Sequence, residues 1–203
     1  MFDLLAGLTL GYLVGSFPSA VVVTRLAGRN IFEVGSGNMG AMNTARNVGW
    51  AAGSAVLLLD VAKGVIAVLL AQYLAVITGN SAAIQFTMPL AAGVGAVTGH
   101  AWSAFAGLKG GKALATTFGA ALPIYPLAAF YTLLLLVALL LISRRTTLSA
   151  VAAIAAYPAI VMTVLARSNT EQGQAFAILT SVLLIAAIVI FKHLWHPAGR
   201  PAR

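Results

Sequence analysis

The chain has 203 residues, of which 61% are hydrophobic and 8% are charged, with a formal net charge of +8 and no cysteine. The absence of cysteine excludes disulfides and thiolate chemistry, and the basic residues lie in short loops and tails rather than in a nucleic-acid-binding patch. Because each bilayer crossing takes roughly 20 apolar residues and the chain offers several such runs, we predict one all-α integral membrane domain over residues 1–203.

The first apolar run extends from Leu4 to Leu26. No basic segment precedes it, so we expect a permanent membrane helix rather than a signal peptide. Small residues at a spacing of four within this run allow close helix approach, and Pro18 is expected to kink the helix. Arg25 and Arg29 indicate that its second end is cytoplasmic.

A polar segment, GSGNMGAMNTARNVG, follows at residues 35–49. Closely spaced glycines let backbone N–H groups turn toward one point, and such an array binds anions. An arginine alongside adds a planar fork of donors for a phosphate. The alternative is a glycine-rich connector whose asparagines satisfy only the turns of the backbone.

The second long run, Ala51 to Thr78, contains two charges, Asp60 and Lys63. On a helix these residues share a face. Charges inside a bilayer are costly, usually pair and often mark a functional cavity. We interpret them either as a neutralised structural pair or as a pair in which Lys63 also faces a phosphate.

The third run, Gln85 to Ala106, holds His100 and leads into a basic glycine loop, Lys109-Gly110-Gly111-Lys112. This loop has the chemistry of a phosphate cradle but lacks the Walker A spacing. An ordinary basic loop at the membrane interface is the alternative interpretation. For His100, a histidine that hydrogen-bonds and fixes a loop is as good an interpretation as a functional one.

The stretch from Leu114 to Ser143 decides the number of crossings. If it crossed once, Arg144-Arg145 and the C-terminal tail would lie outside, against the positive-inside bias. Two short helices of about 15 residues, turning near Pro123 and Pro126, would return both groups to the inside. The alternative is one long tilted helix broken by prolines.

Two further apolar runs, Leu148 to Ala166 and Gln174 to Phe191, complete the pattern. We therefore predict about seven transmembrane helical segments, some short or broken, with the N-terminus outside and the C-terminus cytoplasmic.

Several motifs, in this order, resemble the bacterial acyl-phosphate:glycerol-3-phosphate acyltransferases. They are GS-x-P at 15–18, VGSGNMGAMNTARNVG, LLLDVAKG, the GH…LKGGK…AT block at 99–116, and a terminal Lys-His. The resemblance implies a multi-pass protein of the bacterial cytoplasmic membrane with its active site facing the cytoplasm. It would transfer a fatty acyl group from acyl phosphate to the sn-1 hydroxyl of glycerol 3-phosphate, giving lysophosphatidic acid and phosphate.

The resemblance also implies that neither a metal nor a cofactor is needed. The expected partners are the two substrates and membrane lipids, with no nucleic acid, and we expect a monomer. Because acyl phosphate is already an activated mixed anhydride, the protein has only to hold two anions close together and align hydroxyl with carbonyl. The substrate's own phosphate is the expected base, since no side-chain base stands out.

The site residues come partly from the polar segments and partly from the resemblance. We expect catalytic roles for Ser36, Arg46, Lys112 and His193, and substrate binding by Gly35, Gly37, Asn38, Asn43, Lys63, Lys109, Gly110, Gly111, Thr147 and His196.

The chain departs from the family pattern at several of these motifs. Ser103 stands at a usual proline, Ala113 at a usual glycine, Met42 at a usual threonine, Thr147 at a usual serine, and His196 at a usual asparagine. These changes leave two rival interpretations open. One is a phosphate or organophosphate transporter built on broken helices; the other is a non-catalytic paralogue that binds lipid.

Overall fold

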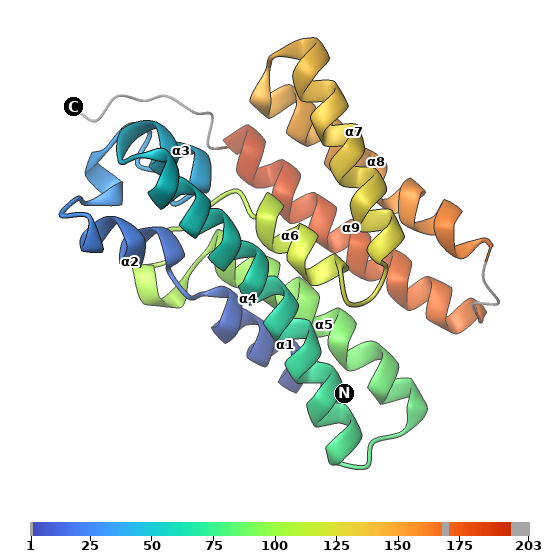
Figure 1. The fold of residues 1–203 in the computed structure, drawn as a ribbon. Coiled ribbons are helices and arrows are strands. Elements are labelled where there is room, and N and C mark those ends of the chain that lie inside the picture. The colour runs from blue at the N-terminus through green and yellow to red at the C-terminus, as the bar shows by residue number, and fades with distance from the viewer. Residues whose placement is uncertain (1, 168–170, 196–203) are drawn as a thin grey trace.

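The computed structural model describes residues 2–167 and 171–195, and this part of the chain is helical apart from its loops. The all-α prediction is thereby confirmed. Figure 1 shows the helices arranged as one elongated bundle, with the short helices α2 and α3 gathered at one end. The elements are α1 (Phe2–Gly15), α2 (Ser19–Leu26), η1 (Ile31–Glu33), α3 (Ala41–Asn47), α4 (Trp50–Ile77), α5 (Ala82–Ala101), η2 (Ala104–Ala106), α6 (Leu114–Ala121), α7 (Pro126–Ser143), α8 (Thr146–Leu165) and α9 (Gln172–Trp195).

Six segments of the described chain are long and apolar enough to cross a membrane. They are Phe2–Leu26, Trp50–Ile77, Ala82–Ala106, Pro126–Ser143, Thr146–Leu165 and Gln172–Trp195. The first contains both α1 and α2, because the chain breaks at Pro18 and starts a new helix at Ser19 instead of kinking a single helix. A seventh crossing, and the orientation of the two termini, stay predictions.

The stretch from Leu114 to Ser143 does form two helices, α6 and α7, with Pro126 in the first turn of α7. Their lengths differ from the equal halves that we predicted: α6 has 8 residues and α7 has 18. At 1.5 Å per residue α6 is about 12 Å long, too short to cross a bilayer alone. Lys112, before α6, and Thr146, after α7, line the same cavity, so the pair leaves one end of the bundle and returns to it.

Helices α1 and α5 pack closely through small residues. Gly7 meets Met88 and Gly15 meets Ala96, so the contacts advance in the same direction and the helices run parallel. A methyl group added at Gly15 would collide with the backbone of Ala96. The spacing-of-four pattern in the first apolar run therefore supports close backbone contact, as predicted.

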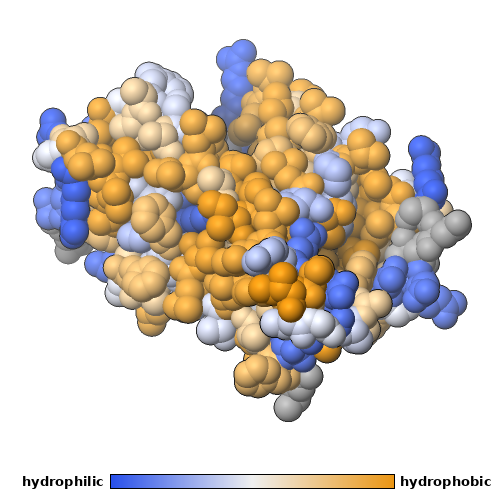
Figure 2. All heavy atoms as spheres, turned by 60° about the horizontal axis from the view of Figure 1, so that its bottom comes forward, coloured by the Kyte–Doolittle hydropathy of each residue, from blue (hydrophilic) through white to orange (hydrophobic). Residues whose placement is uncertain are grey.

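Large apolar side chains cover much of the outside of the bundle. Leu58, Leu134 and Phe176, on three different helices, are 64–74% exposed. Figure 2 shows one face that is mostly hydrophobic. A surface of this kind suits lipid tails rather than water.

Candidate active site

A cavity of about 1810 Å³ opens between α4, α6, α7 and α8 and reaches the loops at one end of the bundle. Two loops form its polar end: the first loop, residues 34–47, which includes α3, and the second loop, residues 107–113. Most of the predicted site residues line it. They are Gly35, Ser36, Gly37, Asn38, Asn43, Arg46, Lys109, Gly110, Lys112, Thr147 and His193.

Asn43 holds the first loop together. Its Oδ1 accepts a hydrogen bond from the Ser36 N–H (3.1 Å), and its Nδ2 donates to the carbonyls of Val34 (3.1 Å) and Asn38 (3.0 Å). Asn47 Nδ2 donates in turn to the Asn43 carbonyl and Oδ1. The Asn43 side chain is thus occupied within the loop, and this geometry favours a scaffolding role over direct contact with a substrate.

Two polar side chains of the first loop are left accessible. Ser36 and Arg46 are exposed, and Arg46 lies in the last turn of α3. Gly35 and Gly37 adopt φ of 56° and 67°, in the left-handed region that glycine enters without steric cost. The loop therefore presents a hydroxyl and a guanidinium to the cavity, two donors that suit an anion, while the Ser36 and Gly37 N–H groups are used within the loop, by Asn43 and the Val34 carbonyl.

The second loop folds back on the end of α5. The Gly111 N–H donates to the His100 carbonyl (3.1 Å), and the Leu108 N–H donates to the Ser103 carbonyl (2.8 Å). A Cβ at Gly110 would collide with the carbonyl oxygens at the end of α5. Glycine is required there because the backbone itself lies against backbone.

The two lysines of the second loop differ in environment. Lys109 is exposed, with Nζ 5.0 Å from the centre of the Phe32 ring in η1, just before the first loop. Lys112 is half-buried, and burial lowers the pKa of its ammonium group below the ordinary value, because desolvation disfavours the charged form. A phosphate bound in the cavity would form an ion pair with the Lys112 ammonium group and so compensate for the solvation that burial removes.

The end of α9 brings a third group of polar side chains to the cavity. His193 is buried, and its Nδ1 lies 2.8 Å from the Val189 carbonyl one turn earlier. Since a carbonyl only accepts, Nδ1 carries the proton, and Nε2 is left to accept from, or when protonated donate to, a ligand. Lys192 also lines the cavity, with Nζ 5.2 Å from the Trp102 ring centre.

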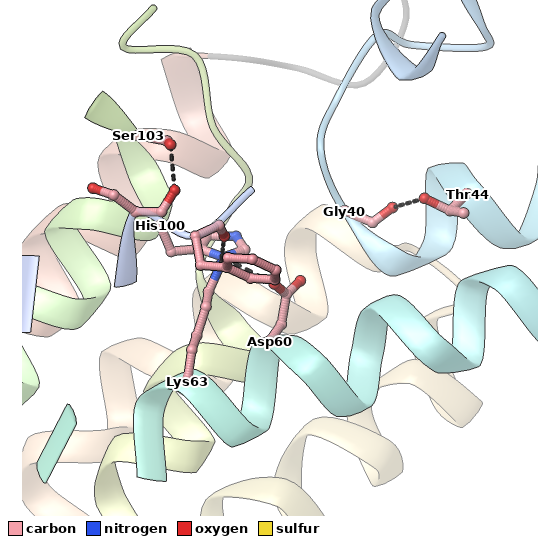
Figure 3. Close-up of polar contacts among 8 residues, drawn as sticks. Gly40, Thr44, Asp60, Lys63, His100 and Ser103 are labelled. Carbon is pink, nitrogen blue, oxygen red and sulfur yellow. Dashed lines mark hydrogen bonds and ion pairs between the residues drawn. The ribbon is translucent and has the colours of Figure 1, made fainter. Parts of the chain in front are cut away.

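The structure places two predicted site residues elsewhere. Lys63 and Gly111 are buried in the packed interior beside the cavity, and Lys63 Nζ donates to the Phe17 carbonyl (3.0 Å) and pairs with Asp60 (2.9 Å) (Figure 3). His196 lies outside the described residues. In the described ranges, no group of three or more histidine, aspartate or glutamate side chains is placed to hold a metal ion.

Sequence reasoning did not assign Lys192, Asp60 or His100 to the site, although all three line the cavity wall. The signal for Lys192 was present in the basic pair that it forms with His193. For Asp60 and His100 the sequence signal was weaker, because their position at the cavity depends on how α4 packs against α5.

Away from the loops the cavity becomes an apolar groove. Helices α4, α7 and α8 form its sides and α6 lies against α4 and α7. The apolar lining residues are Leu57, Leu58, Val61, Leu114, Phe118, Leu133, Leu136, Leu140 and Ile154. One continuous cavity thus joins a cationic end to a hydrocarbon-like end.

Comparison with known proteins finds the chain similar to glycerol-3-phosphate acyltransferases. The family model described as glycerol-3-phosphate acyltransferase matches residues 5–196. Glycerol-3-phosphate acyltransferase 1 of Dehalococcoides mccartyi is 41% identical over 205 residues, covering 95% of this chain and 92% of that protein.

Two solved structures are also similar. Both are of PlsY (YgiH), described as an integral membrane glycerol 3-phosphate acyltransferase. The glycerol 3-phosphate form has a TM-score of 0.79 and 28% identity, covering 95% of this chain and 88% of that one. The lysophosphatidic acid form has a TM-score of 0.76 and 26% identity, covering 94% and 87%.

Proposed function

The chain belongs to the glycerol-3-phosphate acyltransferase family, and on this basis we propose that it moves a fatty acyl group from acyl phosphate to the sn-1 hydroxyl of glycerol 3-phosphate. The products are lysophosphatidic acid and phosphate. Related structures described as holding glycerol 3-phosphate and lysophosphatidic acid support the acceptor and the product. The donor and the position of transfer are those that the resemblance to the acyl-phosphate-dependent acyltransferases implies, and the two-part cavity is compatible with such a donor.

The observation that carries the proposal is the two-part cavity. Acyl phosphate has the same two parts, a hydrocarbon tail and a dianionic head joined at a reactive carbonyl. The groove between α4, α7 and α8 suits the tail, and the two loops suit the head and the second anion, glycerol 3-phosphate. The carbonyl then lies where the apolar lining gives way to Lys112 and the first loop.

The reaction needs little covalent help from the protein. The sn-1 hydroxyl oxygen bonds to the acyl carbonyl carbon, and the bond from that carbon to the phosphate oxygen breaks. The hydroxyl proton passes to a phosphate oxygen of the substrate. Lys112, Arg46 and the Ser36 hydroxyl hold the two anions side by side and stabilise the negative charge that develops, while His193 Nε2 is available to orient the acceptor.

We place the site on the cytoplasmic side of a bacterial inner membrane, with the N-terminus outside and the protein acting as a monomer. The distribution of charge supports this orientation. At the site end of the described chain the basic residues outnumber the acids, Glu33 and Asp60; they are Arg25, Arg29, Arg46, Lys109, Lys112, Arg144, Arg145 and Lys192. Excess lysine and arginine mark cytoplasmic loops.

Purified protein in detergent, supplied with synthetic palmitoyl phosphate, tests the proposal. We expect release of inorganic phosphate that depends on glycerol 3-phosphate and is matched by lysophosphatidic acid. Uptake of glycerol 3-phosphate into proteoliposomes without acyl transfer would instead identify a transporter. Binding of anionic lipid with neither activity would identify a non-catalytic paralogue.

A further inference from the structure

Three ionisable side chains meet in the interior between α4 and α5, next to the active site. Asp60 Oδ1 lies 2.9 Å from Lys63 Nζ and 3.4 Å from His100 Nδ1 (Figure 3). All three residues are at most 6% exposed. Such a group inside a membrane protein is expensive to bury and is seldom retained for stability alone.

Lys63 connects this cluster to the break between α1 and α2. Its ammonium donates to the Phe17 carbonyl, which precedes Pro18 and lies outside regular helix. Directly beside this contact, Ser103 Oγ donates to the Ser16 carbonyl, and the Ala104 N–H donates to Ser16 Oγ (3.3 Å). Ser103 and Ala104, which lead into the second loop, are therefore hydrogen-bonded to Ser16 at the break between α1 and α2.

His100 connects the cluster to both loops. Its carbonyl accepts from the Gly111 N–H, and its ring lies so close to Gly111 that an added Cβ would collide with Nε2. The same Cβ would lie 3.1 Å from the Met39 carbonyl of the first loop. The imidazole therefore occupies the point where Asp60, the second loop and the first loop converge.

Rotating the His100 ring would remove the surface on which Gly111 rests, one residue before Lys112. Asp60 faces Nδ1 and limits that rotation, and Lys63 supplies the opposite charge that lets Asp60 stay buried. We propose that Asp60 and His100 are positioning residues, which set where the second loop holds Lys112 relative to the first loop without contacting the reacting atoms. The proposal rests on the acyl transfer proposed above.

Replacing His100 with alanine tests this directly. A displacement of about 1 Å in a catalytic group costs on the order of 10²-fold in rate, so we expect His100→Ala to lower kcat/KM by about that factor, with most of the loss in kcat. The matched control is Thr98→Val on the same helix, because the Thr98 hydroxyl bonds only within α5, to the Val94 carbonyl. The control is expected to stay within about twofold of the parent. A His100→Ala enzyme with a kcat near that of the parent would overturn the proposal.

A double-mutant cycle separates positioning from general damage to the fold. Gly111→Ala should inactivate the parent protein by collision with the imidazole, yet cost much less in the His100→Ala background, where that space is empty. Additive losses would mean that the ring does not act through Gly111 and would overturn the proposal. Asp60→Asn combined with Lys63→Gln removes both charges together, and we expect its kcat to fall toward that of His100→Ala.

A readout without acyl transfer keeps the two proposals distinguishable. Inorganic phosphate should raise the melting temperature of the parent protein by binding the folded cavity, and His100→Ala should lose most of this rise. If phosphate stabilises the parent but not His100→Ala, and the parent transfers no acyl group, the proposed function fails while the role of His100 in placing the second loop stands. If the parent is active and His100→Ala keeps both the rise and the rate, the positioning role fails alone.

Discussion

The two loops at the polar end of the cavity are built in different ways. The first loop is held by side chains of its own sequence, since Asn43 bonds to Ser36, Val34 and Asn38. The second loop has no comparable internal side-chain scaffold among the described hydrogen bonds; it rests on His100 and Ser103 at the end of α5. The geometry of the first loop is thus set by its own sequence, whereas that of the second loop depends on the packing of the bundle.

This difference predicts how each loop fails. Damage to the first loop's scaffold should unfold that loop and leave the second in place. Damage near the second loop should shift it as a piece, because Gly110 lies against the backbone at the end of α5 and Gly111 lies against the His100 ring. Activity needs both, since one anion must be held next to the other.

The largest effect is expected where the cation itself is removed. Lys112→Ala and Arg46→Ala should each lower kcat/KM by at least about 10³-fold, because a charge that stabilises the transition state in a water-poor site is worth several kcal/mol. Both residues are at least partly accessible, so insertion and melting temperature should change little. Rates close to the parent's for both variants would refute the site assignment.

Removing the first loop's scaffold should be the next most damaging change. Asn43→Ala leaves the Ser36 N–H and two carbonyls without their partner, at a cost of about 1–3 kcal/mol for each group that stays buried. We expect a lower melting temperature and about 10²-fold slower turnover. Asn47→Ala is the matched control, because Asn47 is exposed and bonds only to Asn43. Equal losses in the two variants would mean that Asn43 is not the scaffold.

The contrast between the loops also explains which features the sequence predicted. Both loops were recognisable because glycines and cations stand close together in the chain, and the break before α7 was recognisable from its prolines. The role of Asn43 was not, since an asparagine that bonds its own loop and one that binds a ligand look alike in a sequence. Here the connector-type interpretation describes Asn43, while its neighbours keep the donors of an anion site.

Tertiary packing decided the features that the sequence predicted least well. Lys63 was expected to face a phosphate, but the nearby helix break offers the Phe17 carbonyl as a partner. Helix α6 is shorter than expected. It ends at Ala121, so the chain has already left the helix at residue 122, before either proline. Neither outcome follows from hydrophobic periodicity, which records burial and not the partner that causes it.

A smaller effect should appear in the pH dependence. The pKa of Lys112 is lowered by burial, so on raising the pH its charge is lost earlier than that of an ordinary lysine, and KM for glycerol 3-phosphate should rise. The free energy of unfolding of the substrate-free protein should instead increase as the pH rises. The unfolded chain binds more protons between the two pKa values, so this residue's contribution to stability increases with pH and is lost as pH falls through the folded-state pKa.

Lys112→Arg checks this assignment, because arginine stays charged throughout the accessible range. Its KM should stay flat where that of the parent rises, even if its rate at neutral pH is lower. An alkaline rise in KM of the same size in both proteins would assign the titration to another group.

The smallest effect is expected at Ala113, where the family usually has glycine. Ala113 adopts φ of 60° and is 2% exposed. Glycine would relieve about 1–2 kcal/mol of left-handed strain, but it would lose a buried methyl worth about 0.8 kcal/mol and add about 0.4–1 kcal/mol of chain entropy to the unfolded state. These contributions nearly cancel, so Ala113→Gly should change the melting temperature by only a few degrees and kcat by less than about threefold.

Ala113→Val is the contrasting variant, because a β-branched residue is much less compatible with this φ, and it should displace the second loop as strongly as His100→Ala. A large loss in Ala113→Gly would show that the methyl group, rather than the backbone conformation, holds the second loop against the bundle.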